Sequence, residues 1–227
     1  RSVVAVRRLA KGDEWIPGYA VRLPEARLLP RLAGMTPRRS GLILLFILGL
    51  AAVLRILFQR EVAGDPYLAD PAVDSLFHHY WARGEATGDW TPPPNHGAVD
   101  LRGTPYFRPP GYPWFLGLVY RATGPDPAAG RWANTALGLL NILLIYLLAR
   151  QLLGEGAGLW AAGLLAAYGV LIFFEAELME PVLSITVLLL ALLGLSRVDN
   201  RPRWGLGLGT GFLLGALAVI RPNALVM

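Results

Sequence analysis

The sequence contains no cysteine and little charge. Without Cys among its 227 residues the chain has no disulfide and no thiolate metal site, and its redox compartment stays open. Charged residues make up only 16%, hydrophobic residues 54%, and the mean hydropathy is +0.45. These values lie on the membrane side of the range for globular chains. The net charge of +5 could suggest nucleic acid, but the arginines cluster beside apolar runs, which argues against that partner.

Five apolar runs come close to the roughly 20 residues that a membrane-spanning helix needs. They cover residues 41–58, 132–149, 157–174, 181–196 and 204–220. Only the first contains a charge, Arg55, whose long side chain we expect to reach the headgroups. In lipid each span must satisfy its own backbone, so all five are predicted to be helices. The predicted fold class is therefore an all-α polytopic transmembrane helix bundle.

The charge of the loops predicts the orientation. Residues 1–40 carry nine Lys or Arg against three acids, and 59–131 carry six against eight. Residues 175–180 hold three acids and no base, whereas 197–203 hold three arginines and one acid. We therefore predict a cytoplasmic tail at 1–40 and outer loops at 59–131 and 175–180. Residues 1–34 are either part of that tail or a spurious extension upstream of Met35. Residues 41–227 are predicted to be the N-terminal part of a transmembrane domain whose C-terminal part is missing.

The long outer loop contains a predicted interfacial helix over residues 73–85. Its apolar side chains fall on one helical arc: Val73, Leu76, Phe77, Tyr80 and Trp81. Tyr and Trp suit headgroup depth. Asp74 stands at the edge of the arc, with His78 four residues later. The later apolar segment 112–120 is too short to span a membrane, which predicts an interfacial or re-entrant position.

Carboxylates from the two outer loops are the first candidates for chemistry. They are Asp65, Asp70, Asp74, Glu175, Glu177 and Glu180. Such a set can supply a general base and an electrostatic partner. Helix capping and solvated loop charge explain any single member more simply. Arg108 and Arg221 each precede a proline at an outer membrane edge, where a guanidinium suits phosphate oxygens. Anchoring to lipid headgroups explains these arginines equally well.

Two further patterns are weaker. Asp74 and His78 could share a divalent metal, but adjacent His78 and His79 cannot both face it from one helix, so no cofactor is certain and a divalent metal stays possible. Gly207, Gly211 and Gly215 recur every four residues in an apolar run. This spacing does not complete a nucleotide-binding G-x-G-x-x-G. It predicts a close-packing face for another transmembrane helix.

The order of these features resembles a known enzyme class. The segments are VDSLFHHYWARGEATGDW, YFRPPGYPWFLGLVYRATG, RWANTALGLLNILLIYLLARQLLG, AAYGVLIFFEAELMEPVL and GLGTGFLLGALAVIRPNAL. From about Met35 onward the chain resembles membrane glycosyltransferases of the GT-C class. Specifically, it is similar to the bacterial, family 39-like relatives of dolichyl-phosphate-mannose protein mannosyltransferases.

The resemblance implies transfer of a sugar from a polyprenyl-phosphate donor to an acceptor hydroxyl at the outer face of the bacterial inner membrane. It implies that Asp74 is the catalytic base, with Asp70 as a rival because relatives carry two adjacent acids where this chain has Asp74–Ser75. Arg108 and Arg221 would stabilise the lipid phosphate, and Glu177 or Glu180 would orient the acceptor or Asp74. The sugar and the acceptor, whether protein, lipid or glycan, stay open. A multi-span transporter or a non-catalytic membrane scaffold is the alternative function.

Overall fold

The computed structural model describes residues 37–65, 71, 73–92, 108–200 and 204–226. Contacts divide the chain into Arg1–Pro30 and Arg31–Met227, and every described residue lies in the second unit. The predictions for residues 1–34 and for Asp70 fall outside the described residues.

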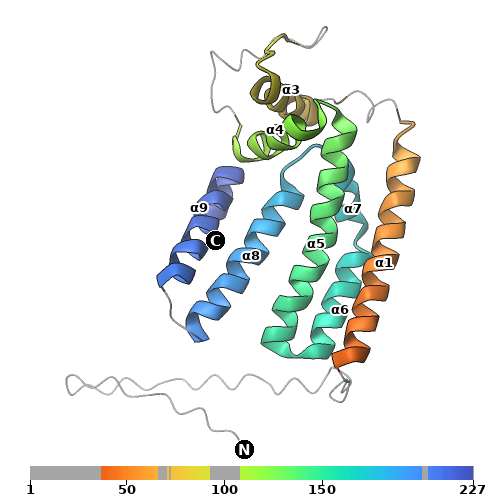
Figure 1. The fold of residues 1–227 in the computed structure, drawn as a ribbon, viewed down its shortest axis with the longest axis vertical. Helices are drawn as coiled ribbons and strands as arrows, with labels where there is room; N and C mark the ends of the chain where they lie inside the picture. The colour runs from red at the N-terminus through yellow and green to blue at the C-terminus, as the bar shows by residue number, and fades with distance from the viewer. Residues whose placement is uncertain (1–36, 66–70, 72, 93–107, 201–203, 227) are drawn as a thin grey trace, which may run out of the picture. The chain divides into compact units, whose positions relative to one another are not determined.

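All regular secondary structure in the described part is helical (Figure 1), as the predicted fold class requires. The α-helices are α1 (Pro37–Val62), α3 (Val73–Thr87), α4 (Gly111–Thr123), α5 (Pro127–Leu153), α6 (Glu155–Ala166), α7 (Gly169–Ala176), α8 (Pro181–Asn200) and α9 (Trp204–Ile220), followed by the 3-10 helix η1 (Pro222–Val226).

The apolar runs form helices, but the third is not one straight span. Arg38–Val62 and Pro127–Leu153 are long and apolar enough to cross a membrane. The run 157–174 is instead divided between α6 and α7, which are bent by 54° and make a third span only as a broken pair. Tyr168 has an extended backbone between them, so the prediction of an unbroken helix was wrong. Pro181–Arg197 and Trp204–Ile220 are shorter apolar helices.

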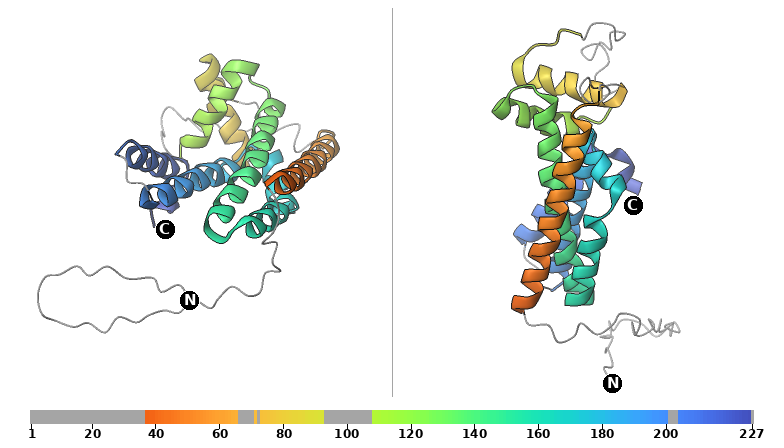
Figure 2. Two further views of the ribbon diagram at one scale, coloured as in Figure 1. Left: turned by 60° about the horizontal axis from the view of Figure 1, so that its bottom comes forward. Right: turned by 90° about the vertical axis from the view of Figure 1, so that its right-hand side faces the viewer.

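Helix α5 is the centre of the bundle, with α6, α8, α7 and α1 packed around it (Figure 2). A turn at Gly154, with φ of 97°, reverses the chain from α5 into α6, and this backbone region favours glycine. Helices α8 and α9 approach closely where Gly194 meets Thr210, because a Cβ at Gly194 would collide with the threonine side chain.

The glycines predicted to pack against another helix are open in this structure. A Cβ at Gly207, Gly211 or Gly215 would meet nothing within 4 Å in the described part of the chain. The close contact of α9 with α8 uses Thr210 instead. The predicted packing face on these glycines therefore stays a prediction.

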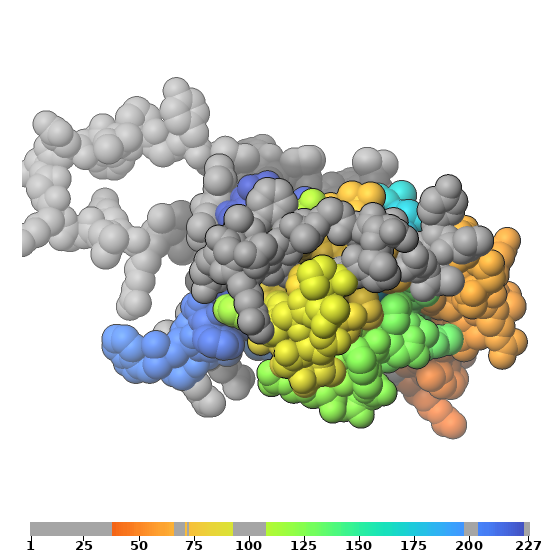
Figure 3. Space-filling model, turned by 90° about the horizontal axis from the view of Figure 1, so that it is seen from above, coloured from red at the N-terminus to blue at the C-terminus, as the bar shows by residue number. Residues whose placement is uncertain are grey.

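Helices α3 and α4 pack against each other at one end of the bundle, and both reach the surface there (Figure 3). The predicted interfacial helix 73–85 is α3, and the short segment 112–120 lies in α4. On α3 the rings of Phe77, Tyr80 and Trp81 are buried. Val73, which the sequence puts on the same apolar arc, is 82% exposed. It opens the helix with a φ of 49°, outside the helical geometry that the arc assumes.

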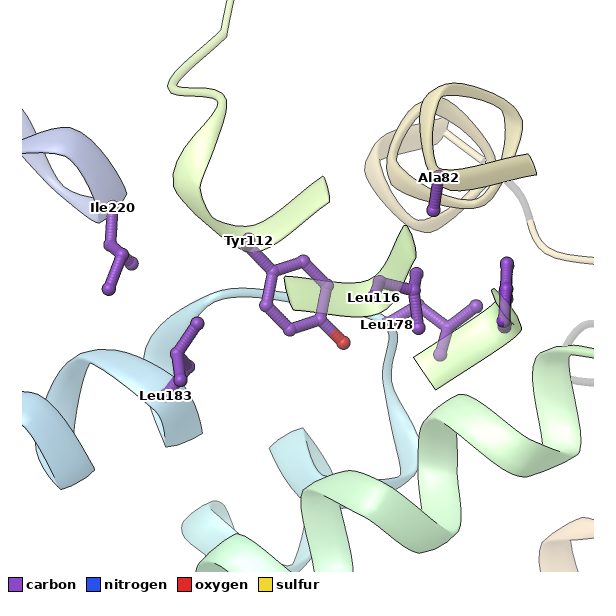
Figure 4. Packing of buried hydrophobic residues seen from close by; sticks show 7 residues of the cluster. Ala82, Tyr112, Leu116, Leu178, Leu183 and Ile220 are labelled. Atoms are coloured by element: carbon purple, nitrogen blue, oxygen red, sulfur yellow. The ribbon is translucent and has the colours of Figure 1, made fainter. Parts of the chain in front are cut away.

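A hydrophobic cluster joins this pair of helices to the bundle (Figure 4). Its fully buried members from α4 are Tyr112, Leu116 and Tyr120. They contact Leu178, Leu183, Ile220 and Ala82 from four other segments. Burying large rings and branched side chains together stabilises the contact through the hydrophobic effect, so α3 and α4 are held firmly on the ends of α5, α8 and α9.

Arg55 does not reach toward the headgroups, contrary to the prediction. Its side chain is 1% exposed, and its Nε lies 2.8 Å from Glu175 Oε2 on α7. Its Nη1 also donates to the carbonyl of Ala166, at 3.1 Å. Because the break after α6 offers a carbonyl and α7 offers a carboxylate, Arg55 finds its partners inside the bundle. Glu175 was expected in an outer loop. It lies instead on α7, where it forms a buried ion pair with Arg55 of α1.

Candidate active site

Asp74 lies in the first turn of α3 and forms an ion pair with Arg108. Arg108 stands just before α4, and its guanidinium carbon lies 5.6 Å from the centre of the Phe77 ring. The side chains of Asp74 and Arg108 are 31% and 33% exposed. The two residues that the sequence assigned to different tasks are thus direct neighbours, at a place that solvent and ligands can reach.

The loop between α7 and α8 meets α3 beside this pair. Ser75 donates a hydrogen bond of 2.7 Å from its hydroxyl to Glu177 Oε2. Asn134 of α5 donates from its side-chain amide to the carbonyl of Glu177, at 2.8 Å. Glu177 is therefore held by α3 through its carboxylate, which accepts from the residue next to Asp74, and by α5 through its backbone carbonyl. The two acid-rich loops do meet at one end of the bundle.

His78 ties the same loop to α3. Its Nδ1 lies 2.8 Å from the carbonyl of Leu178, and because a carbonyl only accepts, Nδ1 carries the proton. Burial is the main cause that lowers the pKa of His78, and Arg108 lowers it further. The Leu178 carbonyl, Glu180 and Asp74 oppose that shift. His78 is therefore a neutral, hydrogen-bonded contact between α3 and the loop.

The adjacent histidines point to different partners. His79 Nδ1 is hydrogen-bonded to the hydroxyl of Tyr120, at 2.8 Å, whereas His78 engages Leu178. Asp74 is engaged by Arg108. No group of three or more metal-binding side chains occurs among the residues that the structure describes. The possible metal shared by Asp74 and His78 thus gains no support from this arrangement.

Glu180 and Arg221 border the same end of the bundle. Glu180 is half-buried and close enough to His78 and Tyr112 to act on both electrostatically. Arg221 is exposed and directly follows α9. A Cβ at Gly111, the first residue of α4, would lie 2.6 Å from the side chain of Ile220. Arg221, which follows Ile220, therefore lies beside the start of α4. That helix begins three residues after Arg108.

Sequence reasoning missed Arg131, on the first turns of α5. Its side chain is only 8% exposed, and Glu177 acts on it electrostatically. The sequence interpretation counted Arg131 as a loop charge, because the apolar run was read from Trp132. The signal was nevertheless present: an arginine at the edge of an apolar helix is costly unless a partner or a function requires it.

The fold and the site define an integral membrane protein with carboxylates and arginines gathered at one end of a helix bundle. The model of the dolichyl-phosphate-mannose-protein mannosyltransferase family matches residues 107–227, more than half of the chain. The chain belongs to this family, and it is a membrane glycosyltransferase of the mannosyltransferase-like type. Searches of the curated proteins and of the solved structures gave no match.

Proposed function

We propose that the protein transfers a sugar from a polyprenyl-phosphate donor to an acceptor hydroxyl, with Asp74 as the general base. The observation that carries this proposal is the Asp74–Arg108 ion pair at the point where the two acid-rich loops meet. Asp74 takes the proton of the acceptor hydroxyl, and the oxygen attacks the anomeric carbon as the bond to the donor phosphate breaks. The sugar is transferred with inversion.

The arginines stabilise the phosphate that leaves. Arg108 is engaged by Asp74 in the ligand-free protein, and a donor phosphate offers it a second anionic partner of the geometry that guanidinium prefers. When the phosphate binds Arg108, the ion pair between Arg108 and Asp74 weakens. Asp74 is then available to take the proton from the acceptor hydroxyl. Arg221, beside the start of α4, binds the same phosphate from the side of α9. Asp70 is the rival base and lies outside the described residues.

The loop acids orient the reactants. Glu177 is fixed beside Asp74 through Ser75, and Glu180 lies near His78. We assign them to the positioning of the acceptor or of Asp74. From the charges of the loops we place the site on the outer face. Cysteines introduced at Ala98 and Asn200 would then react with a membrane-impermeant reagent from opposite sides, and reaction from the same side would refute this orientation.

A transporter remains the second candidate, because a broken helix and charges within the spans are features of transport sites. Both features are present in α6–α7 and in the Arg55–Glu175 pair. Here, however, the two features satisfy each other: Arg55 binds the carbonyl of Ala166 at the break and the carboxylate of Glu175 beyond it. The broken helix and the buried ion pair therefore stabilise the bundle. We assign the chemistry to the partly exposed end of the bundle instead.

Asp74→Asn in the full-length protein is the decisive experiment. Asparagine keeps the shape of the side chain and removes the proton acceptor, and a general base contributes roughly 10² to 10⁴ in rate. We expect normal membrane insertion and a loss of transfer rate of at least about 100-fold. Asp89→Asn is the matched control, because Asp89 lies in the same loop and is exposed, where it accepts a hydrogen bond from Thr91.

The alternatives predict other results. If Asp74 only caps α3, asparagine caps nearly as well and activity stays close to normal. An inactive Asp70→Asn with an active Asp74→Asn would move the base four residues upstream within the same enzyme class. Equal, mild losses at Asp70, Asp74 and Asp89 would show that the acidity of this loop has no chemical role.

A further inference from the structure

Arg131 is a buried cation, and no carboxylate in the described part of the chain forms an ion pair with it. It lies on α5, five residues after the N-cap Asp126, and is 8% exposed. Its Nε has no hydrogen-bond partner among the described residues. A buried ion is costly unless it is paired and hydrogen-bonded. An anionic partner at this position would therefore stabilise the buried charge.

The two carboxylates that act on Arg131 electrostatically are hydrogen-bonded to other groups. Glu177 and Asp126 both act on Arg131 electrostatically. Glu177 Oε2, however, accepts from the hydroxyl of Ser75 at 2.7 Å, and Asp126 Oδ1 accepts from the backbone amide of Ala128 at 2.9 Å, capping α5. In the described part of the chain no carboxylate forms an ion pair with Arg131. Its counter-charge is therefore not supplied at contact distance.

The other polar groups near Arg131 are phenols. Tyr112 and Tyr120 of α4 both act on it electrostatically. Burial raises the pKa of each tyrosine, so both hydroxyls stay neutral. Both are already hydrogen-bonded, Tyr112 with Asn134 and Tyr120 with His79. In the described part of the chain, therefore, no neighbour supplies Arg131 with a negative charge at contact distance. An unmatched guanidinium suits an oxyanion, because it can bind two phosphate oxygens at once.

We propose that Arg131 is a binding residue for a phosphate group that enters the end of the bundle from outside the chain. Arg108 is one third exposed and paired with Asp74, whereas Arg131 is 8% exposed and its Nε has no hydrogen-bond partner in the described part of the chain. Arg131 is therefore a second, buried guanidinium whose charge a phosphate would neutralise. The identity of the ligand rests on the proposed function: the phosphate belongs either to the polyprenyl carrier or to the acceptor. Both sources share the chemistry, and the experiment separates them.

Thermal unfolding of the full-length protein in detergent tests the proposal, with polyprenyl phosphate and glycerol phosphate as probes. Removing an unpaired buried charge does not weaken the ligand-free protein, so Arg131→Met should unfold at the wild-type temperature or above it. A charge-assisted contact is worth about 1.5–3 kcal/mol, or at least about tenfold in affinity. The ligand concentration needed for half-maximal stabilisation should therefore rise at least about tenfold. Arg121→Met is the matched control, since this exposed arginine of α4 donates to the carbonyl of Glu85.

The two probes separate the sources. Weakened stabilisation by polyprenyl phosphate assigns Arg131 to the carrier. Glycerol phosphate should further stabilise wild-type protein that is already saturated with polyprenyl phosphate. If Arg131→Met binds polyprenyl phosphate normally but loses this additional stabilisation, Arg131 belongs to the acceptor site. Unchanged binding of both probes overturns the proposal, as does Arg131→Met with a lowered ligand-free unfolding temperature and wild-type affinities.

A second variant covers failure to fold. Arg131→Lys keeps the charge and loses the planar fork, so it should unfold like the wild type and bind its phosphate more weakly. Wild-type affinity of Arg131→Lys for both probes would refute the proposal. The outcome is separable from that of Asp74→Asn, because ligand affinity does not depend on the identity of the base.

Discussion

The protein pairs an arginine with a carboxylate in two places, and the two pairs differ in exposure. Arg55 and Glu175 are each 1% exposed, and Arg55 also binds the carbonyls of Ala51 and Ala166. Asp74 and Arg108 are about one third exposed. A sealed pair cannot exchange partners with water or a substrate while the helices around it stay packed. An open pair can, because water or a substrate can replace either member.

This difference assigns the two pairs to separate tasks. The Arg55–Glu175 pair binds α1 to α7 across the break after α6, just before the loop that carries Glu177 and Glu180. The Asp74–Arg108 pair lies where that loop meets α3. The buried pair is thus placed to hold the loop, and the open pair lies where the proposed function puts the reactants.

Breaking the buried pair should have the largest effect on stability. Glu175→Gln leaves Arg55 buried without its counter-charge, which costs about 3–5 kcal/mol when one partner of a buried pair is removed. Thermal unfolding of the full-length protein in detergent, followed by tryptophan fluorescence, should show a clear loss. The double variant Arg55→Met with Glu175→Met removes both charges and should recover most of that loss.

The open pair is the control for that experiment. Asp74→Asn should change the free energy of unfolding by no more than about 1 kcal/mol, the range of partly exposed pairs. If Asp74→Asn destabilised the protein as much as Glu175→Gln, both pairs would be structural and the assignment of Asp74 to chemistry would lose its basis.

An intermediate effect is expected at the exposed arginine. Arg221→Lys keeps the positive charge but loses the planar fork that grips two phosphate oxygens. We expect the KM for the lipid-phosphate donor to rise about tenfold, a loss typical of one charge-assisted hydrogen bond, with the KM for the acceptor nearly unchanged. Steady-state kinetics with each substrate varied in turn measures both. Unchanged donor kinetics would make Arg221 an anchor for lipid headgroups.

Much of this arrangement could be predicted from the sequence, because it depends on local patterns. Long apolar runs predict helices, and the helical arc of Phe77, Tyr80 and Trp81 predicted α3. The acidic loops 59–131 and 175–180 were expected to share a face, and Ser75 does contact Glu177.

Contacts between distant segments could not be predicted in the same way. Arg55 was expected at the headgroups because nothing in its own helix shows that Glu175 lies beside it. The break at Tyr168 lies in an unbroken apolar run with no proline, so composition gave no sign of it. Arg131 was counted as loop charge, because its burial depends on how α4 and the Glu177 loop pack near the start of α5.

The smallest expected effect concerns pH and comes from His78. Burial lowers the pKa of His78 in the folded protein below its usual value near 6.5. Below that pH the unfolded chain therefore binds more protons at this position than the folded protein does. Stability should fall as the pH drops below about 6.5, by at most about 1.4 kcal/mol for each unit by which the pKa is lowered. Glu180, Asp74 and Arg108 face the same ring, and the two acids moderate the effect.

His78→Asn tests this dependence, since asparagine can donate to the carbonyl of Leu178 as Nδ1 does but cannot be protonated. The decrease in unfolding temperature from pH 7.5 to pH 5.5 is measured for the wild type and for the variant, and one decrease is subtracted from the other. The subtraction cancels the titration of groups that both proteins share. We expect a smaller acid-induced decrease in the variant. An equal decrease in both proteins would mean that protonation of His78 does not weaken the contact between α3 and the Glu177 loop.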